Sequence, residues 1–592
     1  MTDNTLRKNI DSARKWDPSA IFDSPAEWDD ELASLKGFDV PDEQIIKTPV
    51  ELASSLEEYD DLRRRCGRLW AYARVRSDED TTDSTAQARL EKVNSLLGRL
   101  DAFASILESR IRQFDEETLV NAPVLEGYDH YIRDVFRRAG YTLKSDTREA
   151  VEQLQPVLDA PDSAFRTFMN GDYDAPTVER PDGESVTVSP NNRDQWLRHQ
   201  NRNFRRAVHK AYCEAFDTAH DLLADAFGTA VDRNVRLADL RGYDSALEAA
   251  LDEDPAGGIG QAFPTDAHHE MRRVIRENLD AYHRYYEAKR DHLGVDSLRP
   301  WDRYVSLVPD NGPEIPYERA TELVINAVEP LGQAYQSRLR AYLANRRVDV
   351  YATEKKTSEG LAYTLGVFET DPYLLLNYKA DLRSVFVLAH ELGHAMHIQY
   401  ANEHQPRMYS GFPQAISELP SNLHEVLLAN YLAESGDRIL RTHGIDTALR
   451  RFEDMFFRHA LLATFTQQAH ERAANGEPIT PVWLDETYAN LLAEFQEPLS
   501  ADEETGRTWV GDNQAHRTYG SYQYVLGRAS AHSVADRLEN GDLLPETYQS
   551  FLQAGSSAYP MELFEDLGLD MTTSEPYENA IIAFDEQLRQ IA

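Results

Sequence analysis

The chain has 592 residues and carries 101 Asp and Glu against 62 Lys and Arg, which gives a formal net charge of −39. Hydrophobic residues make up 41% of the chain, enough for a buried core, and this excludes a disordered acidic tail. Because so negative a surface repels phosphate groups and anionic lipids, nucleic acid and membrane surfaces are poor candidate partners.

The type of charge points to the working environment. Arginine dominates the positive charge, and no lysine follows Lys379. Self-repulsion of the carboxylates would destabilise a compact fold in dilute buffer, whereas molar salt shortens the Debye length to about 3 Å. We therefore expect a salt-adapted, halophilic protein. The alternative is an ordinary acidic cytosolic protein with an unusually large charge imbalance.

The cysteine content and the search for targeting segments indicate the cellular compartment. Cys66 and Cys213 are the only cysteines, too few for a disulfide framework or a Cys-based zinc site. The N-terminus at Met1 has no basic and apolar leader, and no uncharged apolar stretch approaches about 18 residues. The sequence predicts a soluble, cytoplasmic protein.

Helical periodicity dominates from the N-terminus onwards. Leu52, Leu56 and Tyr59 begin a series of apolar residues that recur at helical spacing among charged residues. The same pattern predicts a mainly α-helical protein, with helical segments over 48–76, 84–113, 145–170, 190–235, 263–293 and 317–345.

A polar stretch over 170–193 interrupts these helices and contains one short alternating run at 184–188. We take it as the domain boundary. It predicts an N-terminal helical region over residues 1–190 and a second region over 191–592.

Strand character concentrates in one place. The runs 361–368 and 373–378 are rich in β-branched, aromatic and leucine residues and are separated by an Asp-Pro turn. They predict two neighbouring strands of a small β-sheet, directly before an apolar helix over 381–400.

That helix contains a metal-binding pattern. His390-Glu391-Leu392-Gly393-His394 is an H-E-x-x-H motif. Histidines four residues apart lie on one helical face, so both imidazoles can reach one zinc ion at about 2.0–2.1 Å. Glu391 can hydrogen-bond a water on the metal. His397 lies nearly on the same face, and we interpret it as a packed or supporting histidine.

A catalytic zinc commonly has three protein ligands, and the third is not on this helix. Tyr400 stands where the extended motif H-E-x-x-H-x-x-G-x-x-H requires histidine. A carboxylate on the following apolar helix is the better candidate. Glu418 and Glu425 are seven residues apart and share a face, so one can bind the metal while the other supports it.

These segments resemble the oligoendopeptidase F and thimet oligopeptidase family of zinc metallopeptidases, with oligoendopeptidase F the nearer branch. The resemblance rests on the strand ending at Tyr378, on the helix around His390, and on Glu418-Leu-Pro-Ser-Asn-Leu-His-Glu425. It implies that Glu418 is the third zinc ligand, that an N-terminal domain of this family spans about 113–185, and that an elongated body encloses a deep channel for short unstructured peptides.

A late segment concentrates aromatic side chains. Composition alone favours simple packing for His516, Tyr519, Tyr522 and Tyr524. The family resemblance implies instead that His516, Tyr522 and Tyr524 donate hydrogen bonds to the substrate carbonyl and its oxyanion. Ser521 departs from the family pattern, so the role of Tyr519 stays open.

The motif and the family resemblance together imply a zinc endopeptidase with one Zn²⁺ per chain, bound by His390, His394 and Glu418, with Glu391 as general base. Residues 191–592 would form its catalytic domain. Two alternatives remain. A zinc aminopeptidase would share these residues but should contain a Gly-x-Met-Glu-Asn segment, which this sequence lacks. A non-enzymatic helical peptide-binding protein would carry a relict site.

Overall fold

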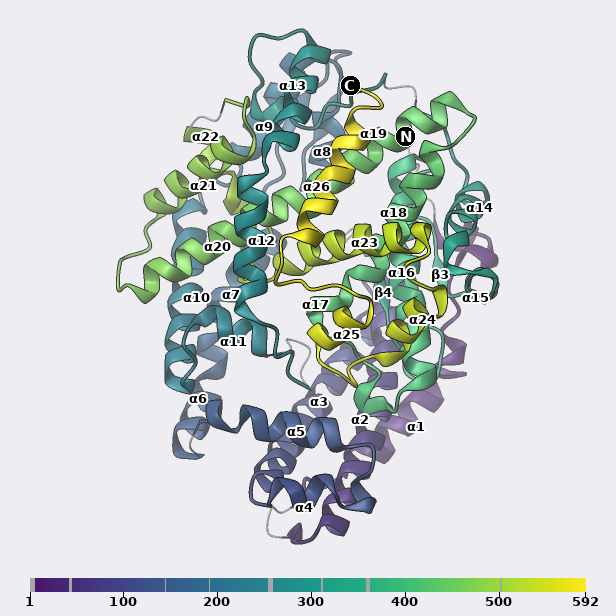
Figure 1. The fold of residues 1–592 in the computed structure, drawn as a ribbon, viewed down its shortest axis with the longest axis vertical. Coiled ribbons are helices and arrows are strands. Elements are labelled where there is room, and N and C mark those ends of the chain that lie inside the picture. The colour runs from purple at the N-terminus through teal and green to yellow at the C-terminus, as the bar shows by residue number, and fades with distance from the viewer. Residues whose placement is uncertain are drawn as a thin grey trace.

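A computed structural model describes residues 6–41, 45–143, 145–190, 192–253, 259–309, 312–357, 362–500 and 503–592. Helices account for 67% of the protein and strands for 3%, which confirms the mainly helical prediction. The molecule is elongated, with helices α2 to α5 at its lower end in Figure 1.

The N-terminal helices form where the sequence supplies both caps and apolar faces. The Thr48 side chain accepts a hydrogen bond from the Glu51 backbone N–H, and Pro49 occupies the first turn. Leu52, Leu56 and Tyr59 are buried on one face of the long helix that follows. The helices here are α1 (Pro25–Leu35), α2 (Pro49–Glu79), α3 (Ser84–Ile111), α4 (Glu116–Val120), α5 (Asp129–Arg137), α6 (Ser145–Leu158) and α7 (Ala160–Gly171).

Four of the predicted helical segments, 145–170, 190–235, 263–293 and 317–345, are each divided into shorter helices. The segment 145–170 breaks at Asp159, and 317–345 breaks at Gly332, whose φ of 93° favours glycine. Apolar periodicity continues across such breaks and does not reveal them. The middle of the chain forms α8 (Arg193–Leu197), α9 (Arg202–Glu214), α10 (His220–Arg241), α11 (Ala246–Asp252), α12 (Thr265–Glu277), α13 (Asp280–Leu293), α14 (Tyr317–Ala327) and α15 (Gln333–Ala344).

The C-terminal part packs around the metal-motif helix. A π-helical segment, Glu453–Arg458, joins α19 to α20. The helices are α16 (Leu382–His404), α17 (Gln414–Ser417), α18 (Leu419–Ala433), α19 (Arg438–Phe452), α20 (His459–Ala474), α21 (Pro481–Phe495), α22 (Glu503–Gly506), α23 (Tyr522–Asn540), α24 (Pro545–Ala554), α25 (Pro560–Asp566) and α26 (Glu575–Leu588).

A small sheet lies next to α16, as predicted, although its strands are shorter. β4 (Ala362–Leu365) pairs antiparallel with β5 (Tyr373–Leu376), and Leu361 lies outside the described residues. A third strand, β3 (Val348–Asp349), pairs parallel to β5 and was not predicted because it is so short. The order is β3-β5-β4. A separate hairpin of β1 (Thr177–Glu179) and β2 (Ser185–Thr187) accounts for the alternating run at 184–188.

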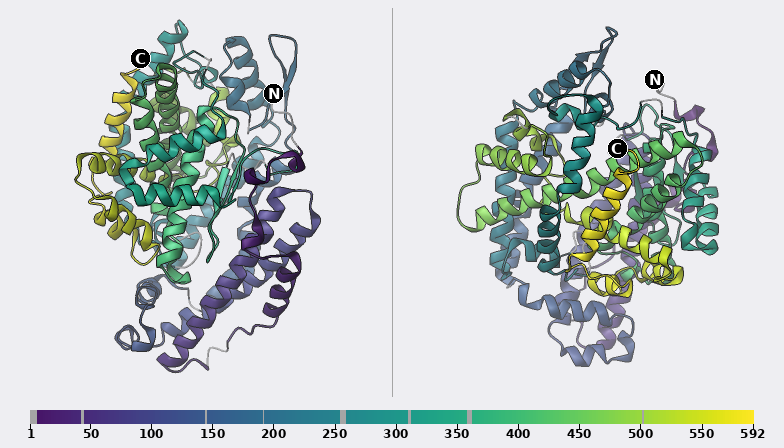
Figure 2. Two further views of the ribbon diagram at one scale, coloured as in Figure 1. Left: turned by 90° about the vertical axis from the view of Figure 1, so that its right-hand side faces the viewer. Right: turned by 45° about the horizontal axis from the view of Figure 1, so that its top comes forward.

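The strand β5 separates two buried apolar cores. Tyr373 and Leu375 pack into a core built mainly from the helices of residues 16–135. Leu374 and Leu376 pack into the larger core, which is built mainly from residues 165–588, because successive strand residues point to opposite faces. The left view of Figure 2 shows these teal strands between the purple N-terminal helices and the green helices. The domain division at residue 190 stays a prediction.

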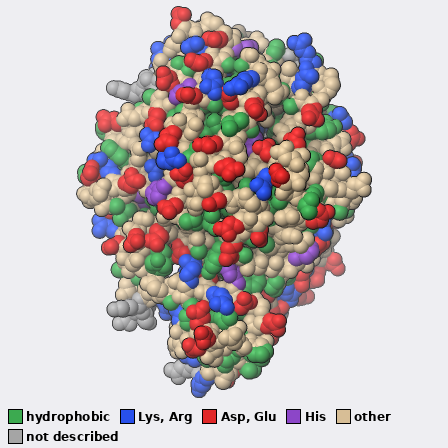
Figure 3. All heavy atoms as spheres, viewed as in Figure 1, with side chains coloured by type: hydrophobic (Ala, Val, Ile, Leu, Met, Phe, Trp, Pro, Cys, Tyr) green, Lys and Arg blue, Asp and Glu red, His purple; other side chains and the backbone are tan. Residues whose placement is uncertain are grey.

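Acidic side chains are spread over the face shown in Figure 3, with Lys and Arg interspersed among them. None of the described helices is both long and apolar enough to cross a bilayer.

The charge imbalance leads to a prediction about stability. We expect the melting temperature to rise as KCl increases from about 0.1 M to about 2 M, because salt screens repulsion among the surface carboxylates. Thermal unfolding followed by circular dichroism measures the shift, and sucrose at matched osmolality is the non-ionic control. A melting temperature that stayed flat or fell across the KCl series would contradict salt adaptation.

Candidate metal centre

The helix α16 presents two histidines to one point. The Asp381 side chain caps its N-terminus by accepting from the Ser384 N–H. His390 and His394 follow one turn apart, with ring centroids 4.9 Å from each other. Both rings lie against a single carboxylate, that of Glu418.

Glu418 reaches this point because it stands at the junction of two helices. It ends α17 and forms the N-cap of α18, which starts at Leu419. The Ser421 hydroxyl donates to its side chain at 3.0 Å, and the Asn422 amide donates to its backbone carbonyl at 2.7 Å. These bonds fix both the helix start and the carboxylate.

The spacing of the three side chains suits a tetrahedral metal ion. Glu418 Oε2 lies 3.4 Å from His390 Nε2 and 3.6 Å from His394 Nε2, and all three ligand atoms lie within 4.8 Å of one another. Two tetrahedral ligands at zinc bond lengths are about 3.3–3.5 Å apart. Two imidazole nitrogens and one carboxylate are also donors that zinc prefers. The residues therefore fit a zinc ion.

Glu425 contacts His390 on the ring nitrogen that faces away from the candidate metal position. Its Oε1 lies 2.7 Å from His390 Nδ1, which directs Nε2 toward the candidate metal position. Arg451 and Arg528 both donate to the Glu425 carboxylate, at 2.9 Å and 2.8 Å to Oε2. Burial opposes ionisation, but the two guanidinium groups hold the pKa of Glu425 well below its usual range. It therefore remains an acceptor.

Two glycines allow the metal-site helices to approach closely. A Cβ on Gly393 would lie 2.4 Å from the carbonyl oxygen of Pro420, and a Cβ on Gly527 would lie 2.4 Å from the Cβ of Glu418. The start of α18 therefore contacts the backbone of both α16 and α23 next to the candidate ligands. Larger side chains at either position would separate them.

The carboxylate next to the first ligand is also fixed in place. The Thr364 hydroxyl of β4 lies 2.8 Å from Glu391 Oε2 and 2.9 Å from the Glu391 carbonyl oxygen. The sheet thus orients the side chain that the motif predicts as the base.

Removing the Thr364 hydroxyl tests this contact. We expect Thr364→Val to lower kcat about tenfold with little change in KM, because a charge-assisted hydrogen bond that orients Glu391 is lost. Steady-state assays with the peptide substrates that the sequence analysis predicts measure both constants. Thr364→Ser keeps the hydroxyl and is expected to retain most of the activity. An unchanged kcat in the valine variant would show that the contact has no catalytic role.

Of the aromatic residues predicted to act on the substrate, only Tyr524 lies on a helix face that points toward the candidate metal centre. The Tyr524 ring contacts the His459 ring in a tilted arrangement, with centroids 4.2 Å apart. Burial raises the pKa of Tyr524 and the nearby Glu418 carboxylate adds to the rise, whereas hydrogen bonding with Arg517 and Gln514 lowers it. Tyr524 stands three residues before Gly527, which contacts Glu418, so it lies on the face of α23 that points toward this candidate ligand.

The other two predicted side chains lie elsewhere. His516 Nε2 is 2.9 Å from the Val510 carbonyl oxygen, and its ring stacks on Phe165 at 4.5 Å. Tyr522 is 1% exposed, with its hydroxyl 3.4 Å from Gln261 Oε1, so the structure does not bring it to the metal residues.

The structure also shows the surroundings of His397 and Tyr519, the two residues whose roles the sequence left open. His397 is fully buried and stacks on Phe412 at 3.8 Å, and burial lowers its pKa to about 3. It is a packed histidine outside the ligand group. Tyr519 adopts a left-handed backbone with φ of 58° directly before Gly520, and both line a large cavity.

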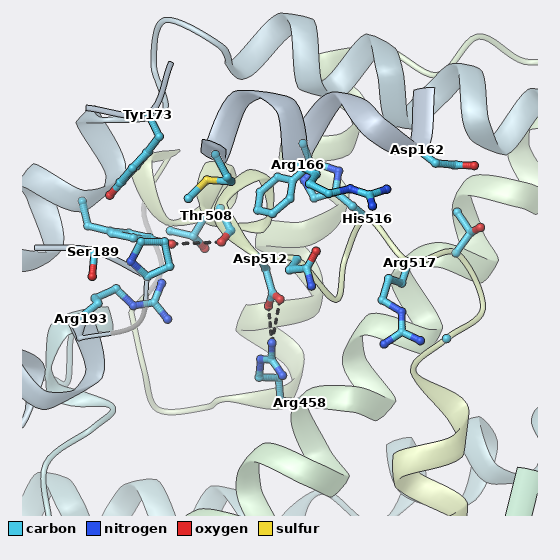
Figure 4. Close-up of a pocket in the computed structure, with 18 of the residues that line it drawn as sticks. Asp162, Arg166, Tyr173, Ser189, Arg193, Arg458, Thr508, Asp512, His516 and Arg517 are labelled. Atoms are coloured by element: carbon cyan, nitrogen blue, oxygen red, sulfur yellow. Dashed lines mark hydrogen bonds and ion pairs between the residues drawn. The ribbon is translucent and has the colours of Figure 1, made fainter. Parts of the chain in front are cut away.

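That cavity has a volume of about 1770 Å³ and lies between α7, α8 and the C-terminal helices. Its described lining includes Gln414, four residues before Glu418, as well as His516 and Arg517 (Figure 4). The largely buried His390, His394 and Glu418 are not part of that lining. The cavity therefore reaches α17, the short helix that ends at Glu418, without including the candidate ligands.

The sequence pattern of Peptidase family M3 matches residues 195–582, more than half of the chain. The chain belongs to peptidase family M3. The Oligopeptidase F pattern matches residues 111–174 of this M3 peptidase. It is 29% identical to "Oligopeptidase PepF" of Bacillus subtilis, over 99% of this chain and 88% of that protein. It is 26% identical to "Oligoendopeptidase F homolog" of Lactococcus lactis, over 99% and 98% of the two chains.

Solved structures share the fold of this M3 peptidase. A peptidase structure from Chlamydophila abortus matches with a TM-score of 0.85 at 24% identity, over 100% of this chain and 99% of that one. Oligoendopeptidase-F from Enterococcus faecium matches with a TM-score of 0.72 at 24% identity, over 97% and 98%. These similarities confirm the predicted fold class.

Sequence reasoning missed several residues of the M3 site. Thr364, Arg451 and Arg528 support Glu391 and Glu425 from distant parts of the chain, so no local spacing marks them. Gly527 offered a weak signal, because glycine inside a helix is unfavourable and often reflects close packing.

Proposed function

We propose that this M3 peptidase is a zinc-dependent endopeptidase that hydrolyses short, unstructured oligopeptides. The arrangement of His390, His394 and Glu418 at tetrahedral spacing carries the proposal, since the same helix places Glu391 beside them. The bordering cavity of about 1770 Å³ supports it, because this volume suits a peptide and excludes a folded protein.

Zinc bound by these three residues would act as a Lewis acid toward the scissile carbonyl and lower the pKa of a water molecule. Glu391 then serves as the general base: its carboxylate accepts a proton from the attacking water and later delivers it to the leaving amine. The hydrogen bond from Thr364 keeps one Glu391 oxygen in place, which leaves the other free for this transfer.

Tyr524 is our candidate for stabilising the oxyanion that forms on the scissile carbonyl. Tyr524 is half-buried on the face of α23 that contacts Glu418, and burial raises the pKa of its hydroxyl, which stays protonated and able to donate. His516 lines the cavity, and we propose that it donates to the substrate carbonyl after release from Val510. Tyr522 is proposed to support this segment from the core.

The edge of the sheet could bind a peptide through its backbone, independently of its amino-acid sequence. In the described part of the sheet β4 is an edge strand, paired with β5 on one side. An extended peptide could add to its other side through backbone hydrogen bonds, beside Glu391. We propose a cytoplasmic, salt-adapted enzyme with one Zn²⁺ per chain that acts on peptides released by other proteases.

Cleavage of a blocked peptide tests the proposal. We expect the zinc-loaded protein, in high salt, to cut an N-terminally acetylated, internally quenched peptide, to lose this activity with a chelator, and to regain it with zinc. An obligate aminopeptidase would cut only the peptide with a free amine. A binding protein with a relict site would cut neither peptide, and either result would overturn the proposal.

A further inference from the structure

The charge of the large cavity differs in sign from that of the molecule. Its described lining carries seven Arg and Lys side chains and five Asp and Glu side chains. The whole chain has 62 basic against 101 acidic residues. Basic side chains are therefore concentrated where the proposed function places the substrate.

Three of the five acidic residues of this lining, Asp162, Glu253 and Asp512, form ion pairs with arginines. Arg458 binds both oxygens of Asp512, at 2.8 Å and 2.7 Å, and Arg233 binds Asp162 at 2.6 Å. Figure 4 shows the first pair joined by dashed lines, with the Arg517 side chain extending beside it without such a contact. These carboxylates are thus not available to Arg517.

Arg517 is an exposed cation beside the proposed catalytic groups. It forms no ion pair with any carboxylate of the described residues. The Gly520 backbone N–H donates to the Arg517 carbonyl oxygen at 3.0 Å, and α23 begins two residues later at Tyr522. Gly527 on the same helix contacts Glu418. The turn that carries this cation therefore leads directly into the helix that contacts the third candidate zinc ligand. Since an extended peptide advances about 3.3 Å per residue, a group bound at Arg517 belongs to a residue near the scissile bond.

We propose that Arg517 binds a carboxylate of the substrate, either an Asp or Glu side chain or the peptide's C-terminal carboxylate, and so sets a preference for peptides that carry one near the cleaved bond. This assignment rests on the proposed peptidase function. A guanidinium group forms charge-assisted, often bidentate bonds with a carboxylate, and here it retains unused donors that face the cavity.

A preference for peptides with a carboxylate would oppose the negative electrostatic potential of the whole protein. A net charge of −39 repels acidic peptides at long range, but salt screens that repulsion beyond the Debye length. A direct contact inside the cavity is screened much less. Arg517 therefore allows an acidic enzyme to retain acidic substrates.

Four matched peptides test the assignment. One blocked, C-terminally amidated pair differs only by Glu or Gln next to the cleaved bond, and a neutral pair differs only by a C-terminal acid or amide. Wild-type protein is expected to favour at least one carboxylate peptide about tenfold in kcat/KM, mainly through KM. The pair that shows the preference identifies the source of the carboxylate.

The variant Arg517→Gln is expected to abolish that preference while still cleaving the neutral peptides. Arg166 is a matched control, since it is also an exposed arginine of the lining without an ion pair to a described carboxylate. Arg166→Gln should keep the wild-type ratio. Equal cleavage of each pair by wild type, or an unchanged ratio in Arg517→Gln, would overturn the assignment.

Binding separates failure of this assignment from failure of the proposed function. Fluorescence anisotropy measures the affinity of the same four peptides, labelled and at low temperature. If wild type cleaves nothing but still binds a carboxylate peptide more tightly, and loses this in Arg517→Gln, the peptidase proposal fails and the carboxylate site stands. If cleavage proceeds without any carboxylate preference in binding or rate, the peptidase proposal stands and the site fails.

Discussion

Replacing Glu391 with glutamine is expected to lower kcat by about 10²–10⁴-fold while the protein still binds zinc. The amide has nearly the same size and can still accept the hydrogen bond from Thr364, so the local structure should persist. It cannot accept a proton from water at this position. Peptide cleavage in high salt measures kcat, and elemental analysis of the dialysed protein measures the zinc content.

Glu425→Gln provides a control with the opposite pattern. The variant loses the charge that orients His390 and pairs with Arg451 and Arg528, so we expect zinc affinity to fall about 10–100-fold. Excess zinc should restore part of its activity, whereas it should not rescue Glu391→Gln. Full activity of a zinc-loaded Glu391→Gln protein would rule out Glu391 as the base.

Gly527→Ala is expected to damage both the fold and the metal centre. The added methyl group would lie 2.4 Å from the Cβ of Glu418 and 2.7 Å from its carbonyl carbon, so α23 and α18 must separate. Such overpacking costs about 1–3 kcal/mol of unfolding free energy. Because the shift moves Glu418, zinc affinity should fall as well. Denaturant unfolding and zinc titration with a competing chelator measure the two effects.

Gly98→Ala is the matched control, because Gly98 lies inside α3 and no atom lies within 4 Å of its added Cβ. Removing glycine from a helix there is expected to stabilise the protein by about 0.5–1 kcal/mol without affecting zinc. If Gly527→Ala behaved like Gly98→Ala, the close contact between α23 and Glu418 would not hold in solution.

The sequence predicted the helices well where apolar periodicity coincides with a clear cap. The Thr48 cap and the apolar residues after it defined α2, and Gly541 ended α23 in a left-handed conformation. Periodicity failed at breaks inside an apolar pattern, such as Gly332. It also missed β3, because two residues carry too little pattern to indicate a strand.

The site was predicted to the extent that its residues are close in sequence or belong to a family motif. His390 and His394 followed from the H-E-x-x-H motif and helical geometry. Spacing left both Glu418 and Glu425 as candidates for the third ligand, and the family resemblance selected Glu418. Contacts such as Thr364 with Glu391 depend on how the sheet packs on α16, which no local spacing encodes. Likewise, the burial of Tyr522 and the stacking of His516 on Phe165 arise from tertiary packing.

The two-sided burial of β5 ties the N-terminal helices to the metal centre. Tyr373 and Leu375 belong to one core and Leu374 and Leu376 to the other, while the adjacent β4 holds Glu391 through Thr364. A fragment beginning at residue 195 would therefore expose one apolar face of β5 to water. Such a fragment is expected to aggregate rather than act as a minimal peptidase, although it contains every candidate zinc ligand.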